Sequence, residues 1–266
     1  MPLNKQALGI LYSGVIRLPV HGTRRKAATT TTMSRTNCIA LVSSRPSDFG
    51  REAEWNDWYD EVHLPATLEA SGAWVATRWE TIDRPPGFST PVGFTHVAIY
   101  EFEVERGAAQ LLEIIDGPRT AGGPIHPSHT IIDVDVLTPL GRWADKTEPS
   151  TGLTGQVIAY VGTNDPTREA EWHAWYDDVH APDMMGSGAF SNTTRWVRTA
   201  PARFGPNFLT IYDVEDKPVA EAVALSGAAM GPAARDGRLL DCHAGGLRSA
   251  LQPAGSHGPQ GYRARG

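Results

Sequence analysis

Residues 51–65, REAEWNDWYDEVHLP, occur a second time at residues 168–182 as REAEWHAWYDDVHAP. Eleven of the fifteen positions are identical at a fixed offset of 117 residues. Composition alone does not explain this agreement, so the chain contains an internal repeat. The repeat limits the folds that the chain can adopt. In a chain of 266 residues it predicts two copies of one unit, each of about a hundred residues and large enough to bury a core.

The repeated segment has the periodicity of an amphipathic helix. At about 100° per residue, one face holds Trp55, Trp58, Tyr59 and Val62. An aspartate three residues before each repeated arginine, Asp48 or Asp165, can cap the first amides of the helix. The prolines at positions 65 and 182 disfavour helical geometry in the residue before them, so we expect each helix to end near the repeated histidine, His63 or His180.

Composition and charge exclude several classes of protein. The formal net charge of -6 and the pI of about 5.8 provide no basic surface for general nucleic-acid binding. No apolar run approaches the ~20 residues that a membrane-spanning helix needs, so we expect no membrane partner. Cys38 and Cys242 have no zinc-site or redox-pair spacing, which favours buried free thiols in a reducing compartment, the cytoplasm.

Three segments lie outside the predicted repeats. Residues 1–32 are basic, threonine-rich and free of acidic residues, which fits a targeting segment, but the absence of an apolar run after the paired arginines favours a disordered extension or a misassigned start. Residues 144–156 have the polar, Gly/Pro-bearing composition of a linker. The Pro/Gly-rich residues 252–266 predict a disordered tail.

The two repeats span residues 38–143 and 157–251. The pattern of apolar runs in each predicts the element order βαββαβ, with short helices expected at 108–115 and 220–225. This order is the ferredoxin-like arrangement, an antiparallel four-stranded sheet with two helices on one face. The bare face of each sheet must be buried by a partner. We therefore predict an α+β fold in which the two repeats form an intrachain pseudo-dimer, with the sheets enclosing a barrel-like cavity. Further homo-oligomerisation is left open.

The motif E-W-x-x-W-Y-D-x-V-H-x-P, with a strand ending R-W and a later strand I-Y-D/E-V/F-E, resembles the EthD-like branch of the dimeric α/β-barrel superfamily. The resemblance covers nearly all of residues 38–143 and 157–251. It implies a small enzyme without a cofactor, such as a dehydratase or decarboxylase of aromatic polyketides or a lactone isomerase, active in aromatic degradation or secondary metabolism. Neighbouring branches include haem-degrading and quinone-forming monooxygenases. Unlike a homodimer, this chain carries both copies in tandem.

His63 and His180 are the first catalytic candidates, because a neutral imidazole can take or give a proton near pH 7 without a cofactor. Each has an aspartate three residues earlier, Asp60 or Asp177, on a neighbouring helical position. An aspartate in that place can orient and charge a base. Alternatively, the histidine meets the negative pole of the helix dipole and the aspartate holds the helix end, which would be a structural role.

Arg78 and Arg195 lie in predicted strands, where an arginine is unexpected unless it is solvated, paired or facing a polar cavity. Inside a barrel, each could bind a carboxylate, phenolate or enolate of the substrate by paired hydrogen bonds. The alternative, which the repetition favours, is an ion pair with Asp60 or Asp177 that fastens strand to helix.

Four tyrosines are candidates for substrate contact. Tyr100 and Tyr212 occupy the same position of one predicted strand in the two copies, and either could donate a hydrogen bond into a cavity or fill the core. Tyr59 and Tyr176 precede the repeated histidines by four residues, on the same side of the helix.

Other histidines differ between the copies. His96 has Phe208 as its counterpart, and this asymmetry makes it a further catalytic candidate. His173 lies seven residues before His180, but a metal site on one helix without a third ligand is weakly supported, so no metal is predicted. His126 and His129 lie in a loop that is expected at the surface.

These observations lead to one expected function and two alternatives. We expect a cofactor-independent lyase or isomerase that dehydrates, decarboxylates or cyclises an aromatic, polyketide-like or lactone substrate by histidine proton transfer. One alternative is a monooxygenase of the neighbouring branches. The other is a non-catalytic protein that binds a small molecule. Fold analogy carries the choice among them.

Overall fold

The computed structural model describes residues 36–82, 93–116, 125–140, 152–200, 206–235, 240–254 and 262–263. The predicted N-terminal extension at 1–32 lies outside these residues, as do positions 144–151 of the predicted linker and most of the predicted tail. In the part of the chain that is described, no helix is long and apolar enough to cross a bilayer.

Each repeat contributes four antiparallel strands. In the first repeat these are β1 (Cys38–Pro46), β2 (Val75–Thr81), β3 (His96–Phe102) and β4 (His129–Pro139). In the second they are β5 (Gly155–Thr163), β6 (Asn192–Arg198), β7 (Phe208–Val214) and β8 (His243–Pro253). The strand orders β4-β1-β3-β2 and β8-β5-β7-β6 are equivalent, so the ferredoxin-like order predicted for each repeat is confirmed.

The two sheets join edge to edge into one closed barrel. Strand β4 pairs with β6, and β2 pairs with β8, so the eight strands have no open edge between the repeats. Strand β8 runs through Pro253, into the segment predicted as a tail, and a short strand β9 (Tyr262–Arg263) pairs with β2. The predicted α+β fold, an α/β barrel formed within one chain, is confirmed.

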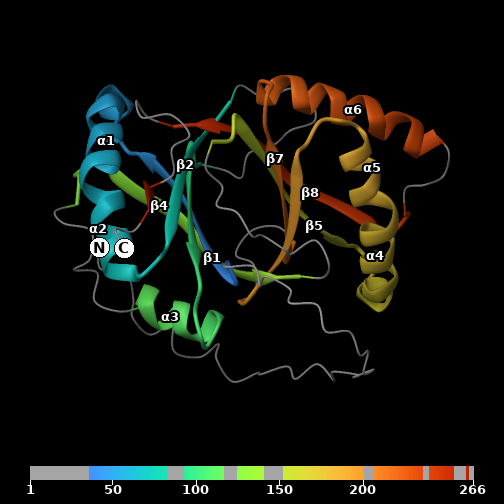
Figure 1. Cartoon of the computed structure of the whole chain (residues 1–266), viewed down its shortest axis with the longest axis horizontal. Coiled ribbons are helices and arrows are strands. Elements are labelled where there is room, and N and C mark those ends of the chain that lie inside the picture. Colours follow the sequence, from blue (N-terminus) through green and yellow to red (C-terminus); the bar gives the residue numbers. More distant parts are fainter. Residues whose placement is uncertain are drawn as a thin grey trace. The chain divides into compact units, whose positions relative to one another are not determined.

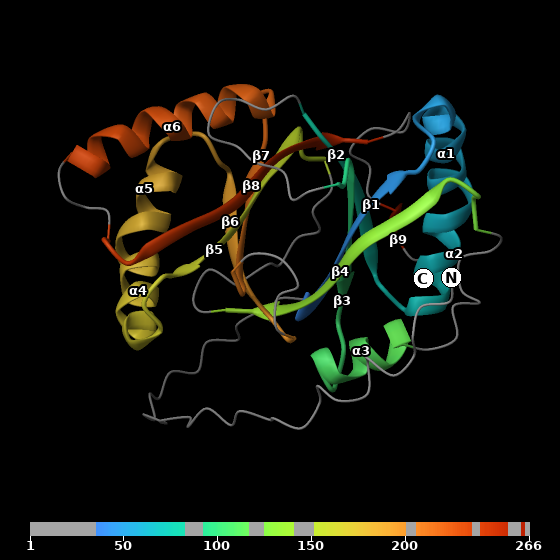
Figure 2. The ribbon, with the colours of Figure 1, turned by 180° about the vertical axis from the view of Figure 1, so that it is seen from behind.

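The helices of the two repeats lie on opposite sides of the strands (Figures 1 and 2). The first repeat contains the 3₁₀ turn η1 (Phe49–Arg51), α1 (Glu52–Trp58), the π-helical turn η2 (Tyr59–His63), α2 (Leu64–Ser71) and α3 (Ala108–Asp116). The second contains η4 (Pro166–Arg168), α4 (Glu169–Trp175), the π-helical turn η5 (Tyr176–His180), α5 (Ala181–Gly186) and α6 (Val219–Arg235). Helix α6 is thus much longer than predicted.

The start of the repeated helix is as predicted, but its end is not. Asp48 accepts a hydrogen bond from the amide of Gly50 at 2.9 Å, and Asp165 accepts one from Thr167 at 3.0 Å, so both predicted caps are confirmed. The helix does not stop at the histidine. It passes through a π turn and continues into α2 or α5, where the proline occupies the first turn, a position that requires no amide hydrogen.

The π turn changes which residues are buried. By widening one turn it moves the following residues around the helix axis, so Val62, predicted on the buried face, is 39% exposed. Asp60 is buried instead. Such turns are frequent at functional sites, and here one occurs in each repeat and ends at the candidate histidine.

Successive strand residues face opposite sides of the barrel wall, as their period of two requires. Apolar side chains from both repeats fill the interior, among them Leu41, Trp79, Ile99, Tyr160, Trp196 and Leu251. The outer faces form two separate clusters with the helices of each repeat. The cavity described below lies in one of these outer layers, between a sheet and its helices, and not in the space enclosed by the two sheets. Bulky tryptophans occupy the space that the sheets enclose.

Candidate functional site

Arg78 fastens β2 to the helix of the first repeat. Its Nη1 donates to Asp60 Oδ1 at 2.5 Å, its Nη2 donates to Asn56 Oδ1 at 2.6 Å, and its guanidinium lies 4.2 Å from the ring centroid of Tyr59. Both charged side chains are almost fully buried. Asp60 already supplies the counter-charge of this buried guanidinium, so a substrate anion would have to displace it.

Arg195 repeats this arrangement in the second copy. It donates to Asp177 and, at 3.0 Å, to Nδ1 of His173, and it lies 4.2 Å from the ring of Tyr176. His173 therefore takes the place of Asn56 as a hydrogen-bond acceptor. The structure thus places both arginines, and the aspartates Asp60 and Asp177, in the strand-to-helix ion pairs that the sequence offered as the alternative to substrate binding.

Each repeat also brings the histidine of its repeated motif against a second histidine from the start of its last strand. In the first repeat, His63 stacks on Trp58 at 4.8 Å between ring centroids, and His129 lies 5.5 Å from His63. Nε1 of Trp55 donates to Nδ1 of His129 at 3.2 Å. His129 is thus a packed residue, and His126 is buried and also contacts Trp58, so the surface position predicted for both was wrong.

The matching pair in the second repeat is His180 and His243. His180 stacks on Trp175 at 5.1 Å and lies 5.8 Å from His243, and Trp172 donates to Nδ1 of His243 at 3.0 Å. Sequence reasoning missed His243. A signal was present, since each of these histidines stands eight residues before the leucine at the end of its strand, Leu137 or Leu251.

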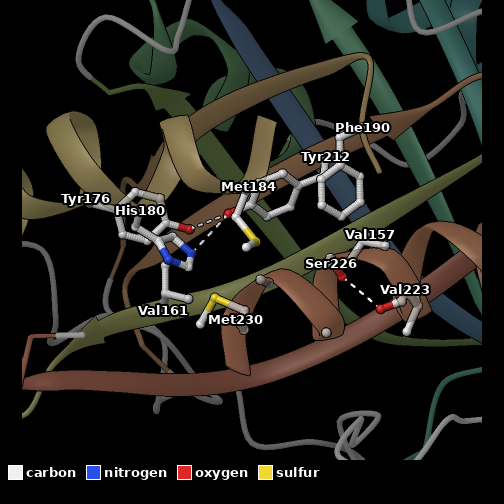
Figure 3. Close-up of a pocket in the computed structure, with 12 residues that line it drawn as sticks. Val157, Val161, Tyr176, His180, Met184, Phe190, Tyr212, Val223, Ser226 and Met230 are labelled. Carbon is white, nitrogen blue, oxygen red and sulfur yellow. Dashed lines mark hydrogen bonds between the residues drawn. The ribbon is translucent and has the colours of Figure 1, made fainter. Parts of the chain in front are cut away.

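Between the second sheet and its helices lies a cavity of about 120 Å³ (Figure 3). Strands β5 and β7, the π turn η5, helices α5 and α6 and the segment before β6 all contribute to its wall. The lining residues are Val157, Ala159, Val161, Tyr176, His180, Met184, Phe190, Tyr212, Val223, Ser226, Gly227 and Met230. Most of this wall is aliphatic or aromatic, and its polar groups are two phenols, one imidazole and one hydroxyl.

A line of hydrogen bonds runs along one side of the cavity. The hydroxyl of Thr210 donates to the Tyr176 hydroxyl at 2.8 Å, the two phenol oxygens of Tyr176 and Tyr212 are 2.9 Å apart, and the Tyr212 oxygen lies 3.4 Å from Nε2 of His180. In Figure 3, dashed lines join the Tyr212 hydroxyl to both Tyr176 and His180, which lie side by side. These contacts join the threonine hydroxyl, the two phenols and the imidazole into one hydrogen-bonded line from Thr210 to His180.

The first repeat retains the tyrosines but changes their surroundings. Tyr59 and Tyr100 correspond to Tyr176 and Tyr212, and burial raises the pKa of both phenols. Strand register places Ala98 where the second repeat has Thr210, and the hydroxyls beside Tyr59 and Tyr100 come instead from Ser44 and Thr67. The two copies therefore offer different chemistry around the same tyrosine pair.

His96 lies in the first repeat, away from this cavity. Its side chain is 2% exposed and packs edge-on against Trp55 at 4.7 Å, and its Nδ1 is 2.9 Å from the hydroxyl of Thr95. Burial, helped by the charge of Arg78, lowers the pKa of His96 to about 3. The carboxylates of Glu52 and Glu80 are 4.0 and 3.9 Å away but are partly exposed, so they do not offset burial.

Because the folded protein keeps His96 neutral while the unfolded chain protonates near pH 6.5, acid should destabilise the fold. Protons bind the unfolded state preferentially between pH 6.5 and about 3, so the contribution is complete above pH 6.5 and is lost as the pH falls. His96→Phe, which installs the residue found at position 208, should reduce the slope of unfolding free energy against pH by up to about 1.4 kcal/mol per pH unit. Urea unfolding between pH 4.5 and 7.5 measures this slope. An unchanged slope would contradict a neutral, buried His96.

His173 was the residue considered as a metal ligand in the sequence, and the structure shows its surroundings. His173 is held by Arg195, and burial, followed by the charge of Arg195, lowers its pKa to about 4. Among the residues that the structure describes, no group of three or more His, Cys, Asp or Glu side chains is arranged to hold a metal ion. Cys38 and Cys242 are buried and unpaired, as predicted, and burial raises the pKa of Cys38 to about 12.

A closed eight-stranded antiparallel barrel with helices on its outside defines the dimeric α/β-barrel class, the two repeats taking the places of two subunits. Comparisons with protein families and with curated proteins find no match. Among solved structures, a candidate chlorite dismutase has a TM-score of 0.51 and 8% identity, covering 84% of this chain and 96% of its own. This likeness establishes the fold alone.

Two further solved structures are less similar. A candidate monooxygenase from Fusobacterium nucleatum has a TM-score of 0.48 and 12% identity, covering 86% of this chain and 99% of its own. A heme-binding protein from Thermus thermophilus has a TM-score of 0.48 and 8% identity, covering 83% of this chain and 92% of its own.

Haem does not fit the cavity of the second repeat. Pockets for cofactors and drug-sized ligands occupy roughly 300–1,000 Å³, whereas this one measures about 120 Å³. Its histidine, His180, faces the Tyr212 hydroxyl through Nε2. We therefore assign no step at this site to haem.

Proposed function

We propose that the second repeat is the active one and that the chain is a monooxygenase of the dimeric α/β-barrel class that uses no bound cofactor. In this proposal the cavity binds a small molecule with a phenolic or enolic hydroxyl, His180 removes its proton, and molecular oxygen attacks the resulting anion. The hydrogen-bonded line from Thr210 to His180 along an otherwise apolar wall is the observation that carries the proposal.

The wall of the cavity supports the choice of base. In the tautomer that carries its proton on Nδ1, His180 would present Nε2 to the cavity as an acceptor that can receive a proton from a substrate hydroxyl. At 3.4 Å its contact with Tyr212 is long for a hydrogen bond, so a substrate hydroxyl could insert between the two groups. Tyr212 would then stabilise the new oxyanion by donating to it.

The same wall favours oxygenation over decarboxylation. No lining residue is an arginine, lysine or carboxylate, so a substrate carboxylate would have no counter-charge, and Arg195 is engaged by Asp177 and His173. Oxygen is small and apolar, and such a wall admits it readily.

The overall reaction balances without a reductant. For a simple phenol, deprotonation followed by attack of O2 on the ring would form a quinone and water, with four electrons passing from the ring to oxygen. One oxygen atom enters the product and the other leaves as water. His180 would return its proton to the departing oxygen, and Tyr212 would hold the phenolate oxygen throughout.

The finer family assignment is also a proposal. We infer that the chain is a tandem EthD-like protein, because both copies carry the E-W-x-x-W-Y-D-x-V-H-x-P motif. Quinone-forming monooxygenases belong to neighbouring branches of that superfamily, so the resemblance is compatible with the proposed reaction. The expected lyase or isomerase activity is kept as the second candidate, because it would use the same His180 and Tyr212 pair.

Oxygen uptake tests the proposal most directly. The protein would be incubated with a panel of phenols and enolisable ketones while oxygen and the absorbance of quinone products are recorded. Substrate-dependent oxygen consumption that requires His180 would support it. Turnover that continues without oxygen would favour the lyase or isomerase, and ligand binding without any turnover would favour a binding protein.

Thr210 should act as a positioning residue for this reaction. Thr210→Val keeps the shape but removes the donor to Tyr176, and loss of one hydrogen bond of about 1 kcal/mol should lower kcat about fivefold. The acidic limb of the kcat profile against pH should also shift, since the hydrogen-bonded line to His180 loses its first member. Thr210→Ser should retain the wild-type profile. A uniform loss in both variants, with an unchanged profile, would indicate a packing effect instead.

A further inference from the structure

The size and entrance of the cavity narrow the class of substrate. We infer that it binds an uncharged, single-ring phenol, which enters past Gly227 of α6 and directs its hydroxyl to Tyr212 and His180. The inference rests on the proposed function for the role of that hydroxyl. The binding itself can be tested without turnover.

Volume sets the number of rings. An engineered apolar cavity of roughly 150 Å³ holds benzene, and the present cavity measures about 120 Å³. The two volumes are of the same order, and this cavity is open to solvent on one side, so one ring with a hydroxyl and a small substituent is close to the upper limit. Met184 and Met230 line the space, and their unbranched side chains can adjust to a ring edge. A fused two-ring or polycyclic compound, as the resemblance suggested, exceeds the space available.

The charge and polarity of the cavity lining limit which substituents the ligand ring can carry. The lining contains no acidic residue, lysine or arginine, and burying an unpaired carboxylate among such side chains is costly. The polar atoms gather at one place, where the Tyr212 oxygen and Nε2 of His180 are 3.4 Å apart (Figure 3). Ser226 is the other polar lining residue, and its hydroxyl donates to the carbonyl of Val223 within α6. One hydroxyl on the ligand, at the Tyr212 end, satisfies this arrangement.

Helix α6 provides the entrance. Gly227 lines the cavity and is exposed to solvent, whereas the lining residues of β5 and β7 are buried. A Cβ atom added at Gly227 would meet no atom within 4 Å, so the space beside this glycine is open. A large side chain there would extend over the opening without displacing the helix backbone.

The test measures binding of 4-methylphenol by titration calorimetry to wild type, Gly227→Phe and Gly186→Phe. Gly186 is the matched control, because it is an exposed helical glycine with open space around it but does not line the cavity. We expect Gly227→Phe to weaken binding by about tenfold or more and Gly186→Phe to leave it unchanged. Equal binding by all three proteins would overturn the entrance and the site together.

Ligand variants test the substrate class in the same assay. Toluene should bind more weakly than 4-methylphenol, and 4-methylbenzoate and 2-naphthol should bind at least about tenfold more weakly. Met230→Ala should restore binding of 2-naphthol by enlarging the cavity, which keeps the test valid if a phenylalanine variant unfolds. Tighter binding of the benzoate or the naphthol by wild type would overturn the inference.

The outcomes also separate this inference from the proposed function. Binding of 4-methylphenol that Gly227→Phe abolishes, without oxygen uptake, would uphold the ligand class and reject the oxygenase. His180-dependent oxygen uptake with only larger or charged substrates would reject the ligand class and uphold the oxygenase.

Discussion

Replacing His180 with alanine is expected to lower kcat by about a hundredfold or more, because a positioned general base contributes about 10²–10⁴ to the rate. His180 lines the cavity and ends the hydrogen-bonded line from Thr210. Oxygen uptake with a phenol under saturating conditions measures the effect. Substrate affinity should change far less than kcat, since the apolar wall would be retained.

The matched control is His63→Ala, the same change in the other copy. His63 stacks on Trp58 as His180 stacks on Trp175, so both variants lose an equivalent aromatic contact. We expect His63→Ala to retain most of the activity and to show a similar change in Tm. If both variants lost activity equally, or if only His63→Ala did, the assignment of the active copy would be incorrect.

Arg78→Ala should destabilise the fold by about 3–5 kcal/mol, the usual cost of breaking a buried ion pair by removing one partner. Asp60 would be left buried without its cation, and Tyr59 would lose the guanidinium that covers its ring. The midpoint and slope of urea unfolding report the loss. Arg195→Ala should cost less, because the side chain of Asp177 is 23% exposed and water screens it.

A double-mutant cycle between Arg78→Ala and Asp60→Ala distinguishes the two roles considered for this arginine. Strong coupling in the free energy of unfolding is expected if the pair fastens β2 to the helix. Normal stability of Arg78→Ala together with a specific loss of ligand binding would instead support a role in substrate recognition.

Features with local spacing were predictable from the sequence. The fixed offset of 117 revealed the repeat, and the order of apolar runs in each copy predicted the ferredoxin-like sheet and hence a barrel. Asp48 and Asp165 indicated where the repeated helices begin. The ion pair between Arg78 and Asp60 was also foreseeable, because an unusual charge in a strand requires a partner.

The end of the repeated helix was not predictable by the same rules. The proline at position 65 normally marks a boundary, and the inserted π turn is the exception that lets the helix continue. His129 and His243 were misjudged or missed for a related reason. Each lies far along the chain from the tryptophan to which it is hydrogen-bonded, Trp55 or Trp172, so no local pattern connects them.

The sequence by itself determined that the chain is a duplicated α/β unit, because periodicity and repetition are properties of neighbouring residues. Only the tertiary structure decided where a ligand could bind. Tryptophans fill the interior of the barrel, and the cavity forms instead where α6 packs over β5 and β7. Its existence and its chemistry depend on residues distant in sequence, such as Thr210 and Gly227, and on how closely their elements pack.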